Sequence, residues 1–417
     1  MSNCLDASRL RLTGASLSGG PVRSVLVTGG RIDAVGQEAD RPPGAGSVEH
    51  LDLTGYVLLP APAEPHAHLD KAMLGERVAN PSGDLLGAID ATRSAYPTMT
   101  GDDVRDRARR ALAIAVRRGY TSLRTHVSCE EGLGLDALHA LVTLRDEVRA
   151  TIDLQVFAMA GYPITGSPGA RNWDLVREAL DAGADGVGGA PWLDSEPASA
   201  VAMLVRLAAE RNLMVDLHLD ETLDRASLSV RTFVLEVKAN ALRGRATASH
   251  LVSLGQQSPD VAREIAAELA DAGISVVTLP QTNLYLQGRA CDTRDPRGLT
   301  AVGILRQAGV VVAGGGDNWR DSFNPTSRID ALETASLLVV AAHLSPADAY
   351  DAVSTNARAA MGLDPGVIAV GHETDMVAIR GSSLVDAMAN ASDDRVVIRR
   401  GRVIARTRVV KEIAPVL

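Results

Sequence analysis

Between about residue 100 and residue 318 the chain alternates segments of helical periodicity with short apolar runs. The apolar runs predict strands at 121–127, 154–160, 186–192, 214–220, 246–251, 275–280 and 310–317, and an earlier run predicts one at 57–66. Several helical segments end at a residue suited to the left-handed cap conformation, such as Asn212 or Gly273. Eight strands separated by helices predict a parallel (β/α)8 barrel of the TIM type, which matches the alternation better than an open sheet does.

Both ends of the chain show a different pattern, with strand-like runs joined by tight turns. Segments 25–36 and 396–405 each predict a β-hairpin, and 374–379 predicts a further strand. We expect these segments to join as a small β-sandwich. The predicted domains are a first part of the β-sandwich at 1–56, the barrel at 57–364 and a second part of the β-sandwich at 365–417.

Composition narrows the classes of partner. Hydrophobic residues make up 46% of the chain, and 42 basic residues stand against 51 acidic ones, for a net charge of −9. This balance argues against nucleic acid or an anionic membrane surface as the main partner. Residues 1–20 lack a signal-peptide core, no run approaches the roughly 20 apolar residues of a membrane span, and the three cysteines are scattered. We therefore expect a soluble cytoplasmic protein.

A His-x-His pair follows the first predicted strand, within the segment Glu64–Lys71. Because alternate residues of a strand point to the same side, His66 and His68 present both imidazoles together. The alternative is a pair of structural histidines, but two adjacent buried imidazoles are costly without partners. The pair therefore predicts two nitrogen ligands of a metal ion.

Further metal-capable side chains stand at the ends of later predicted strands, where such barrels carry their chemistry. His218 ends the fifth strand, and Glu221, three residues later, is suited to moving protons between a metal-activated water and a leaving nitrogen. The alternative for Glu221 is a solvated acid in a loop. His250 ends the sixth strand, either as another ligand or as a group that holds the water. Asp317, after three glycines at the eighth strand, can bind metal and accept a proton from the water.

The residues of the third and fourth predicted strands indicate how many metal ions the site holds. A site with two metals usually needs a bridging anion, but segments 154–160 and 186–192 contain no lysine, aspartate or glutamate. A single divalent ion is therefore favoured. Zn²⁺ and Fe²⁺ both suit three imidazoles, one carboxylate and a water, and the sequence leaves the choice open.

Taken together, these motifs resemble the amidohydrolase superfamily, and within it the cytosine deaminase-like branch. The resemblance covers nearly the whole chain. It rests on the segments Gly30–Ile32, Glu64–Asp70, His218–Glu221, Ala248–His250, Asn283–Arg289, Gly371–Ile379 and Arg400–Ile404. As a set these motifs are specific, so the resemblance implies a hydrolase that acts on carbon–nitrogen bonds other than peptide bonds.

The resemblance also implies a division of roles among the candidate residues. It implies that one catalytic metal is held by His66, His68, His218 and Asp317. It implies that His250 orients the water and that Glu221 carries the proton to the leaving nitrogen.

Two departures from the branch concern the substrate. Where cytosine deaminases have a glutamine that reads the pyrimidine edge, this chain has Ala158–Tyr162, and Asp317 is followed by Asn318 in place of a second aspartate. A buried site that leaves a polar edge of its substrate unsatisfied loses much affinity. Both departures point away from cytosine and towards other nitrogen heterocycles, such as substituted triazines.

Other residues near the strand ends are candidates for substrate contacts, because they can stack on a ring or form hydrogen bonds with it. They are Lys71, His126, Trp192, Gln281, Asn283, Asn318 and Trp319. For the aromatic and amide residues packing is the alternative, and for Lys71 it is an ordinary surface position.

The predicted function is metal-dependent hydrolytic deamination of a small nitrogen heterocycle, with release of ammonia or an amine. The first alternative is ring opening of a cyclic amide on the same scaffold. The second is a catalytically silent barrel that only binds, which the presence of Glu221 and Asp317 disfavours. A homo-oligomer is common for such barrels, although no segment of the sequence indicates an interface.

Overall fold

The computed structural model describes residues 9–18, 20–41, 47–289 and 298–412. The chain divides into two compact units. One comprises Ala63–Ala113 and Ser122–Leu363, and the other comprises Met1–Pro62, Ile114–Thr121 and Asp364–Leu417. Of the three cysteines, Cys129 is buried without a disulfide, and Cys4 and Cys291 lie outside the described residues.

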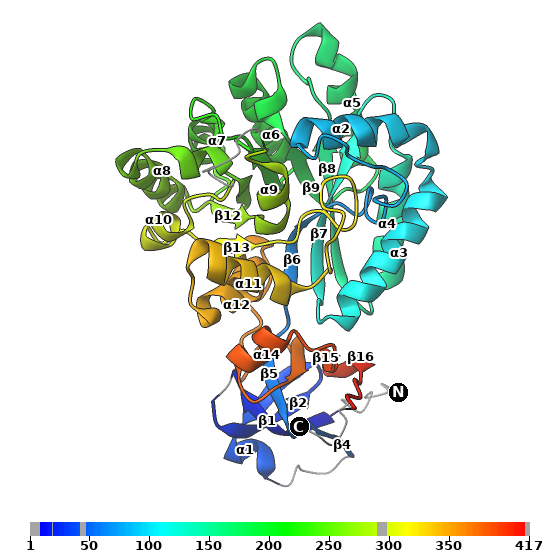
Figure 1. Cartoon of the computed structure of the whole chain (residues 1–417), viewed down its shortest axis with the longest axis vertical. Helices are drawn as coiled ribbons and strands as arrows, with labels where there is room; N and C mark the ends of the chain where they lie inside the picture. Colours follow the sequence, from blue (N-terminus) through cyan, green and yellow to red (C-terminus); the bar gives the residue numbers. More distant parts are fainter. Residues whose placement is uncertain (1–8, 19, 42–46, 290–297, 413–417) are drawn as a thin grey trace, which may run out of the picture. The chain divides into compact units, whose positions relative to one another are not determined.

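The larger unit is a nearly closed barrel of eight parallel strands, which confirms the predicted fold (Figure 1). The strands are β6 (Ala63–Ala67), β7 (Ser122–Cys129), β8 (Asp153–Ala160), β9 (Gly186–Gly189), β10 (Met214–Leu219), β11 (Ala246–His250), β12 (Ser275–Thr278) and β13 (Val312–Gly314). They are hydrogen-bonded in sequence order from β6 to β13. The ring closes where Ala67 forms a bridge with Asp317, whose N–H donates to the His66 carbonyl at 3.0 Å.

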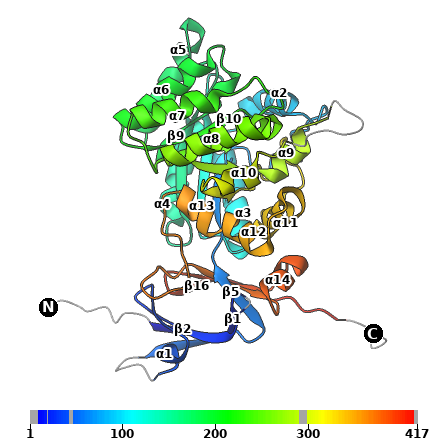
Figure 2. The ribbon, with the colours of Figure 1, turned by 90° about the vertical axis from the view of Figure 1, so that its left-hand side faces the viewer.

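Helices that lie between the strands in the sequence, or follow the last of them, surround this barrel (Figure 2). They are α2 (Leu85–Ala95), α3 (Gly101–Arg117), α4 (Asp136–Val148), α5 (Ala170–Asp181), α6 (Pro197–Glu210), α7 (Ser229–Ala239), α8 (Pro259–Ala272), α9 (Pro280–Leu286), α10 (Val302–Gln307), α11 (Ala331–Ala342), α12 (Pro346–Val353) and α13 (Thr355–Ala360). In α8, Ile265 and Leu269 are fully buried one turn apart, as an amphipathic helix requires. The predicted caps are confirmed at Gly273 and Asn212, which have φ angles of 64° and 53°.

The strand predicted at 57–66 is wrong as a single element. The structure divides it into β5 (Tyr56–Pro60), which pairs in the terminal sheet, and β6, which opens the barrel. Pro60 and Pro62 lack the N–H that a continuous ladder needs, so the chain leaves one sheet before it enters the other. Hydrophobicity alone could not show this break, because residues 57–63 form one apolar run that crosses it and both strands are almost entirely buried.

The terminal segments, expected as a β-sandwich, form one mixed eight-stranded sheet. Besides β5 it contains β1 (Arg9–Leu17), β2 (Val22–Thr28), β3 (Arg31–Val35), β4 (Val48–Asp52), β14 (Met376–Arg380), β15 (Arg395–Arg399) and β16 (Arg402–Thr407), with the short helices α1 (Gln37–Asp40) and α14 (Leu384–Asn390). The hairpins β2–β3 and β15–β16 confirm the predicted ones. Strands from both ends of the chain share one apolar cluster that includes Leu12, Val27, Leu58 and Ile398.

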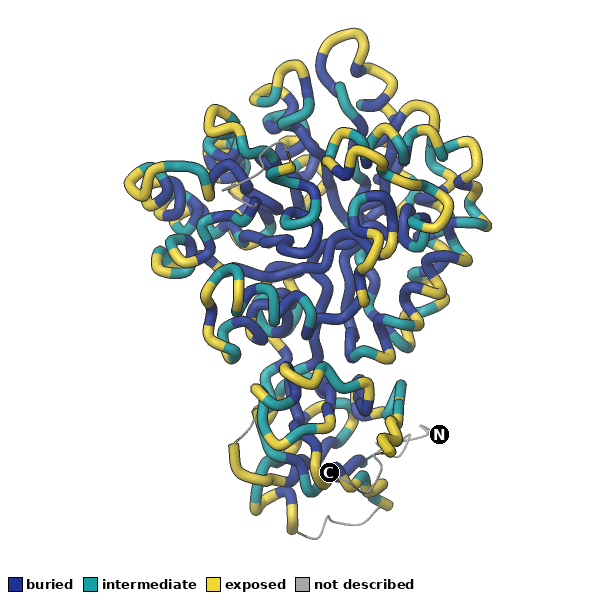
Figure 3. Tube along the Cα trace, viewed as in Figure 1, coloured by how far each residue is buried: buried dark blue, intermediate teal, exposed yellow. Residues whose placement is uncertain are grey.

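The barrel strands are buried almost throughout, whereas exposed residues gather on the outer helices and loops (Figure 3). Among the described residues, no helix is both long enough and apolar enough to cross a bilayer. The cytoplasmic location stays a prediction.

A buried carboxylate joins the two strands at which the barrel closes. Glu64 on β6 accepts the N–H of Gly316 with both oxygens, at 3.0 and 2.9 Å, and the N–H of His66 at 3.2 Å. A Cβ at Gly315 would lie 2.7 Å from Glu64 Oε1, so this position leaves no room for a side chain. The glycines after β13 therefore let the Glu64 carboxylate approach the backbone that precedes Asp317.

We expect Glu64→Ala to lower the free energy of unfolding of the barrel by about 1–3 kcal/mol, because it leaves buried N–H groups without an acceptor. Urea unfolding followed by circular dichroism measures the change. Glu210→Ala, which removes an exposed glutamate from the end of α6, is the matched control. Equal stability of the two variants would show that the Glu64 contacts contribute nothing.

Candidate metal centre and active site

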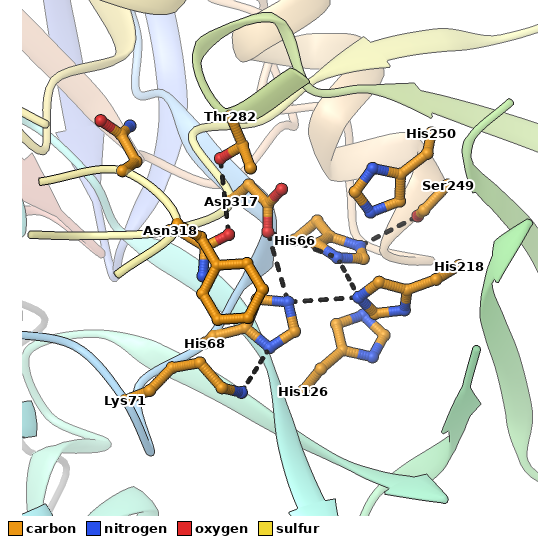
Figure 4. A network of polar contacts seen from close by, with 12 residues as sticks. His66, His68, Lys71, His126, His218, Ser249, His250, Thr282, Asp317 and Asn318 are labelled. Atoms are coloured by element: carbon orange, nitrogen blue, oxygen red, sulfur yellow. Dashed lines mark hydrogen bonds and ion pairs between the residues drawn. The ribbon is translucent and has the colours of Figure 1, made fainter. Parts of the chain in front are cut away.

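Three histidine side chains from two strands meet inside the barrel mouth (Figure 4). His66 Nε2 lies 3.0 Å from His218 Nε2, and His218 Nε2 lies 3.2 Å from His68 Nε2. His66 and His68 stand at the end of β6 with one residue between them, so both rings turn to the same side, towards His218 on β10. All three are buried.

Asp317 and His250 complete this group from the strands next to those of the three histidines. Asp317 follows β13, and its Oδ1 lies 3.3 Å from His68 Nε2 and 3.9 Å from His66 Nε2. His250 ends β11, and its ring stacks on that of His218 with centroids 5.0 Å apart. Both residues have a positive φ, 60° for Asp317 and 71° for His250, which is uncommon for residues other than glycine and is frequent at functional sites. The structure thus brings together all five residues predicted at strand ends.

The chemistry of His66, His68, His218 and Asp317, which we call the His/Asp cluster, fits a divalent metal ion. Two ring nitrogens in contact can share only one proton, so three converging Nε2 atoms cannot satisfy one another. Burial, and then the neighbouring histidine His126, hold the pKa of His66 and of His218 well below the usual value, which favours the neutral imidazole that binds metal. Three nitrogen donors and one carboxylate form the kind of shell that Zn²⁺ and Fe²⁺ prefer.

Glu221 lies beside this cluster in a position suited to proton transfer. Its Oε1 accepts a hydrogen bond from Asn283 Nδ2 at 3.1 Å and lies 3.2 Å from His250 Nδ1. Burial raises the pKa of Glu221 well above its usual value and the charge of Asp317 raises it further, while the hydrogen bond from Asn283 lowers it. The net effect favours a protonated carboxyl group that can donate a proton within the site.

A pocket with about 610 Å³ of space free of atoms opens onto the cluster. Four of the five residues predicted at strand ends line it: His68, His218, His250 and Asp317. Glu221, Lys71 and Asn318 line it too. Lys71 Nζ donates to Asp70 at 3.1 Å and to Ser128 at 3.3 Å, so the lysine is held in the wall and is not a free surface residue.

The remaining predicted substrate contacts do not line this pocket: His126, Trp192, Gln281, Asn283 and Trp319. The Gln281 side chain donates a hydrogen bond to Thr334. Asn283 contacts Glu221 and His250 but does not line the pocket itself. Trp319 is 1% exposed. His126 lies within the barrel, with its ring 4.2 Å from that of His66 and 5.7 Å from that of Phe157. For His126, Gln281 and Trp319 the packing alternative describes the structure better, whereas Asn283 contacts Glu221 and a substrate contact for Trp192 stays a prediction.

A second group of polar side chains, around Glu130, lies on another part of the pocket wall and was not predicted from the sequence. Glu130 accepts hydrogen bonds from Arg93 Nη2, at 2.7 Å, and from the Tyr96 hydroxyl, and the Arg93 guanidinium stacks on the Tyr162 ring at 4.3 Å. All four line the pocket. Arg93 and Tyr96 belong to α2 and the turn that follows it, outside the regular strand-and-helix alternation, so no strand-end signal marked them.

A buried network beneath the cluster was missed as well. Arg124 donates to Asp216 at 2.8 Å, and Ser249 Oγ donates to the other Asp216 oxygen at 2.7 Å. Burial raises the pKa of Asp216, but His126, Arg124 and Ser249 outweigh this effect and bring it to about 2. Asp216 lies two residues before His218 on β10 and so shares its face of the strand, but its partners lie on other strands.

Comparison with known proteins agrees with this geometry. Residues 73–409 match a model described as the amidohydrolase family. The chain is 33% identical over 405 residues to pterin deaminase of Rhizobium rhizogenes, an alignment that covers 95% of this chain and 90% of the relative.

Two solved structures share the whole fold. 5-Methylcytosine deaminase from Klebsiella pneumoniae has a TM-score of 0.88 and 27% identity, over 97% of this chain and 99% of that one. N-isopropylammelide isopropylaminohydrolase from Burkholderia multivorans has a TM-score of 0.83 and 26% identity, over 96% of this chain and 98% of that one.

Proposed function

The chain belongs to the amidohydrolase family, and from this premise we propose that it removes an amino group from a bicyclic nitrogen heterocycle of the pterin kind by hydrolysis. Membership makes it a hydrolase of carbon–nitrogen bonds. The observation that carries the proposal is the position of Glu221, a buried carboxyl group with a raised pKa, in the wall of a pocket that opens onto the His/Asp cluster.

The His/Asp cluster would hold one divalent metal ion, Zn²⁺ or Fe²⁺, which when bound supplies Lewis acidity and lowers the pKa of a water molecule. The other roles belong to side chains. Glu221 donates its proton to a ring nitrogen next to the carbon under attack, then takes the proton of the added hydroxyl group and passes it to the leaving amine. Asn283 holds Glu221 in place, at 3.1 Å. His250 Nε2 has no hydrogen-bond partner within the described part of the chain, so it can orient the attacking water.

The shape and lining of the pocket support a substrate larger than cytosine. Besides the cluster, the pocket has apolar walls that include Ile89, Met159 and Phe323, which suit a flat aromatic ring. A second set of polar groups, Arg93 and Glu130, lines the same pocket. A single pyrimidine has few groups with which to engage both polar sets, whereas a fused second ring offers further nitrogen and oxygen atoms. The identity to pterin deaminase supports the same choice.

Ammonia release by metal-loaded protein tests the proposal. We expect turnover of pterin, with kcat/KM at least about 100-fold above that for cytosine, because the two polar sets can discriminate by about 3 kcal/mol. Mass spectrometry should show the ring intact. An added water without released ammonia would establish ring opening instead. Absence of both reactions in protein with stoichiometric metal would refute the proposal.

A further inference from the structure

A chain of buried hydrogen bonds connects Arg124 to His66 through side chains on four strands. Arg124 Nη1 donates to Asp216 Oδ2 at 2.8 Å, and Ser249 Oγ contacts Asp216 Oδ1 at 2.7 Å. The same Ser249 Oγ lies 2.9 Å from His66 Nδ1. All four side chains are buried, with no more than 1% of any residue exposed. Figure 4 shows the last link, from Ser249 to the His66 ring.

The direction of each hydrogen bond follows from the donors available. An ionised carboxylate can only accept hydrogen bonds. Asp216 therefore accepts one from Arg124 on one oxygen and one from the Ser249 hydroxyl on the other. The Ser249 hydroxyl has a single proton, and the hydrogen bond to Asp216 uses it. Towards His66, Ser249 Oγ can then only accept, so His66 carries its proton on Nδ1. Its Nε2 is left with a lone pair, directed at His218 Nε2 at 3.0 Å.

We propose that Asp216, acting through Ser249, is a positioning residue that fixes the tautomer and ring orientation of His66 before any metal binds. The inference rests on the proposed metal centre and deepens it. A ligand imidazole whose second nitrogen donates to a fixed acceptor loses less freedom on binding and is a better donor to the metal. The positive charge of Arg124 stabilises the ionised Asp216 carboxylate, which is fully buried.

Asp216 could also be considered as a metal ligand, because His66, His126 and Asp216 offer ligand atoms within 4.8 Å of one another. The contacts of Asp216 argue against this role. Both of its oxygens already accept strong hydrogen bonds, and a guanidinium cation lies 2.8 Å from one of them. A divalent cation there would lie close to the Arg124 charge, whereas the His/Asp cluster has no arginine or lysine ion-paired with its carboxylate among the described residues.

The test is Ser249→Ala, which removes the link and leaves the Arg124–Asp216 pair intact. In apoprotein labelled with ¹⁵N-histidine, we expect wild-type His66 to show a protonated Nδ1 and the variant to show a mixture of tautomers. We also expect the variant to bind Zn²⁺ about 10–100-fold more weakly in competition with a chelator. Ser253→Ala is the matched control, because Ser253 is equally buried but donates to the Ser227 carbonyl.

The two readouts separate this inference from the proposed function. A purely structural Ser249 would lower the melting temperature but leave the His66 tautomer and the Zn²⁺ affinity as in Ser253→Ala, and that result would overturn the inference. Asp216→Asn alone leaves Arg124 without a counter-charge and is expected to unfold readily. The double variant Arg124→Met, Asp216→Asn removes both charges, and we expect it to fold with a Zn²⁺ affinity below that of Ser253→Ala. If the wild-type protein did not turn over pterin but the tautomer result held, only the proposed function would be refuted.

Discussion

Glu221→Gln is expected to lower kcat by about 10²–10⁴-fold while the metal content and KM stay close to the wild-type values. Glutamine keeps the shape and the contact with Asn283 but cannot give up a proton as the carboxyl group does. Because burial and the charge of Asp317 raise the pKa of Glu221, its ionised form weakens the fold as the pH rises through that raised value. The variant should therefore be at least as stable as the wild type at pH 8, so unfolding cannot explain its inactivity.

Steady-state ammonia release, with metal analysis on the same sample, measures this effect. Glu131→Gln, an identical change at an exposed glutamate just beyond β7, is the matched control and should retain wild-type kcat. A Glu221→Gln enzyme that retains wild-type kcat with the same bound metal would remove Glu221 from the reaction.

Asp317→Asn is expected to lose both metal and turnover. Asp317 supplies the carboxylate of the His/Asp cluster, and its Oδ1 lies 3.3 Å from His68 Nε2. Burial raises the pKa of Asp317, but His68 and His250 outweigh this effect and hold it below the usual value, so the group is an anion available to a cation. We expect the Zn²⁺ affinity to fall by at least about 100-fold, with kcat at least about 10³-fold lower at limiting metal.

Metal analysis after dialysis against a weak chelator measures the first part, and ammonia release measures the second. Asp174→Asn changes an exposed aspartate of α5 and controls for the loss of one negative charge. If excess Zn²⁺ restored full kcat to Asp317→Asn, Asp317 would be a ligand without a role in catalysis. Unchanged metal content in the variant would exclude it as a ligand.

The barrel and the convergence of its ligands were predictable because both follow from periodicity. Parallel strands bring their carboxyl ends to one edge, so side chains at those ends must meet whatever the intervening helices do. His66, His218 and Asp317 could therefore be brought together from residue numbers alone. The division of 57–66 was less predictable, because residues 57–63 form one apolar run that crosses the change of sheet and only prolines mark it.

Contacts between side chains on different strands could not be predicted from the sequence. Nothing in the segment around Ser249 shows that its hydroxyl lies between His66 and Asp216, because their contact depends on barrel stagger. Periodicity fixes the face on which His126 lies but not the depth, so this histidine was expected in the pocket and lies inside the barrel. Arg93 and Tyr96 reach the pocket from a helix and turn ahead of the second strand, where no pattern predicts a functional residue.

The carboxylate that closes the barrel also sets a constraint on synthesis. Glu64 and Gly316 are 252 positions apart, and His66 and Asp317 flank the same closure. A nascent chain that has emerged only as far as β12 holds His66, His68 and His218 but has neither the closing strand nor Asp317. Until then β6 remains an open edge, which invites pairing with other chains. The His/Asp cluster can therefore be completed only after Asp317 has left the ribosome, and the proposed reaction cannot take place on the nascent chain before then.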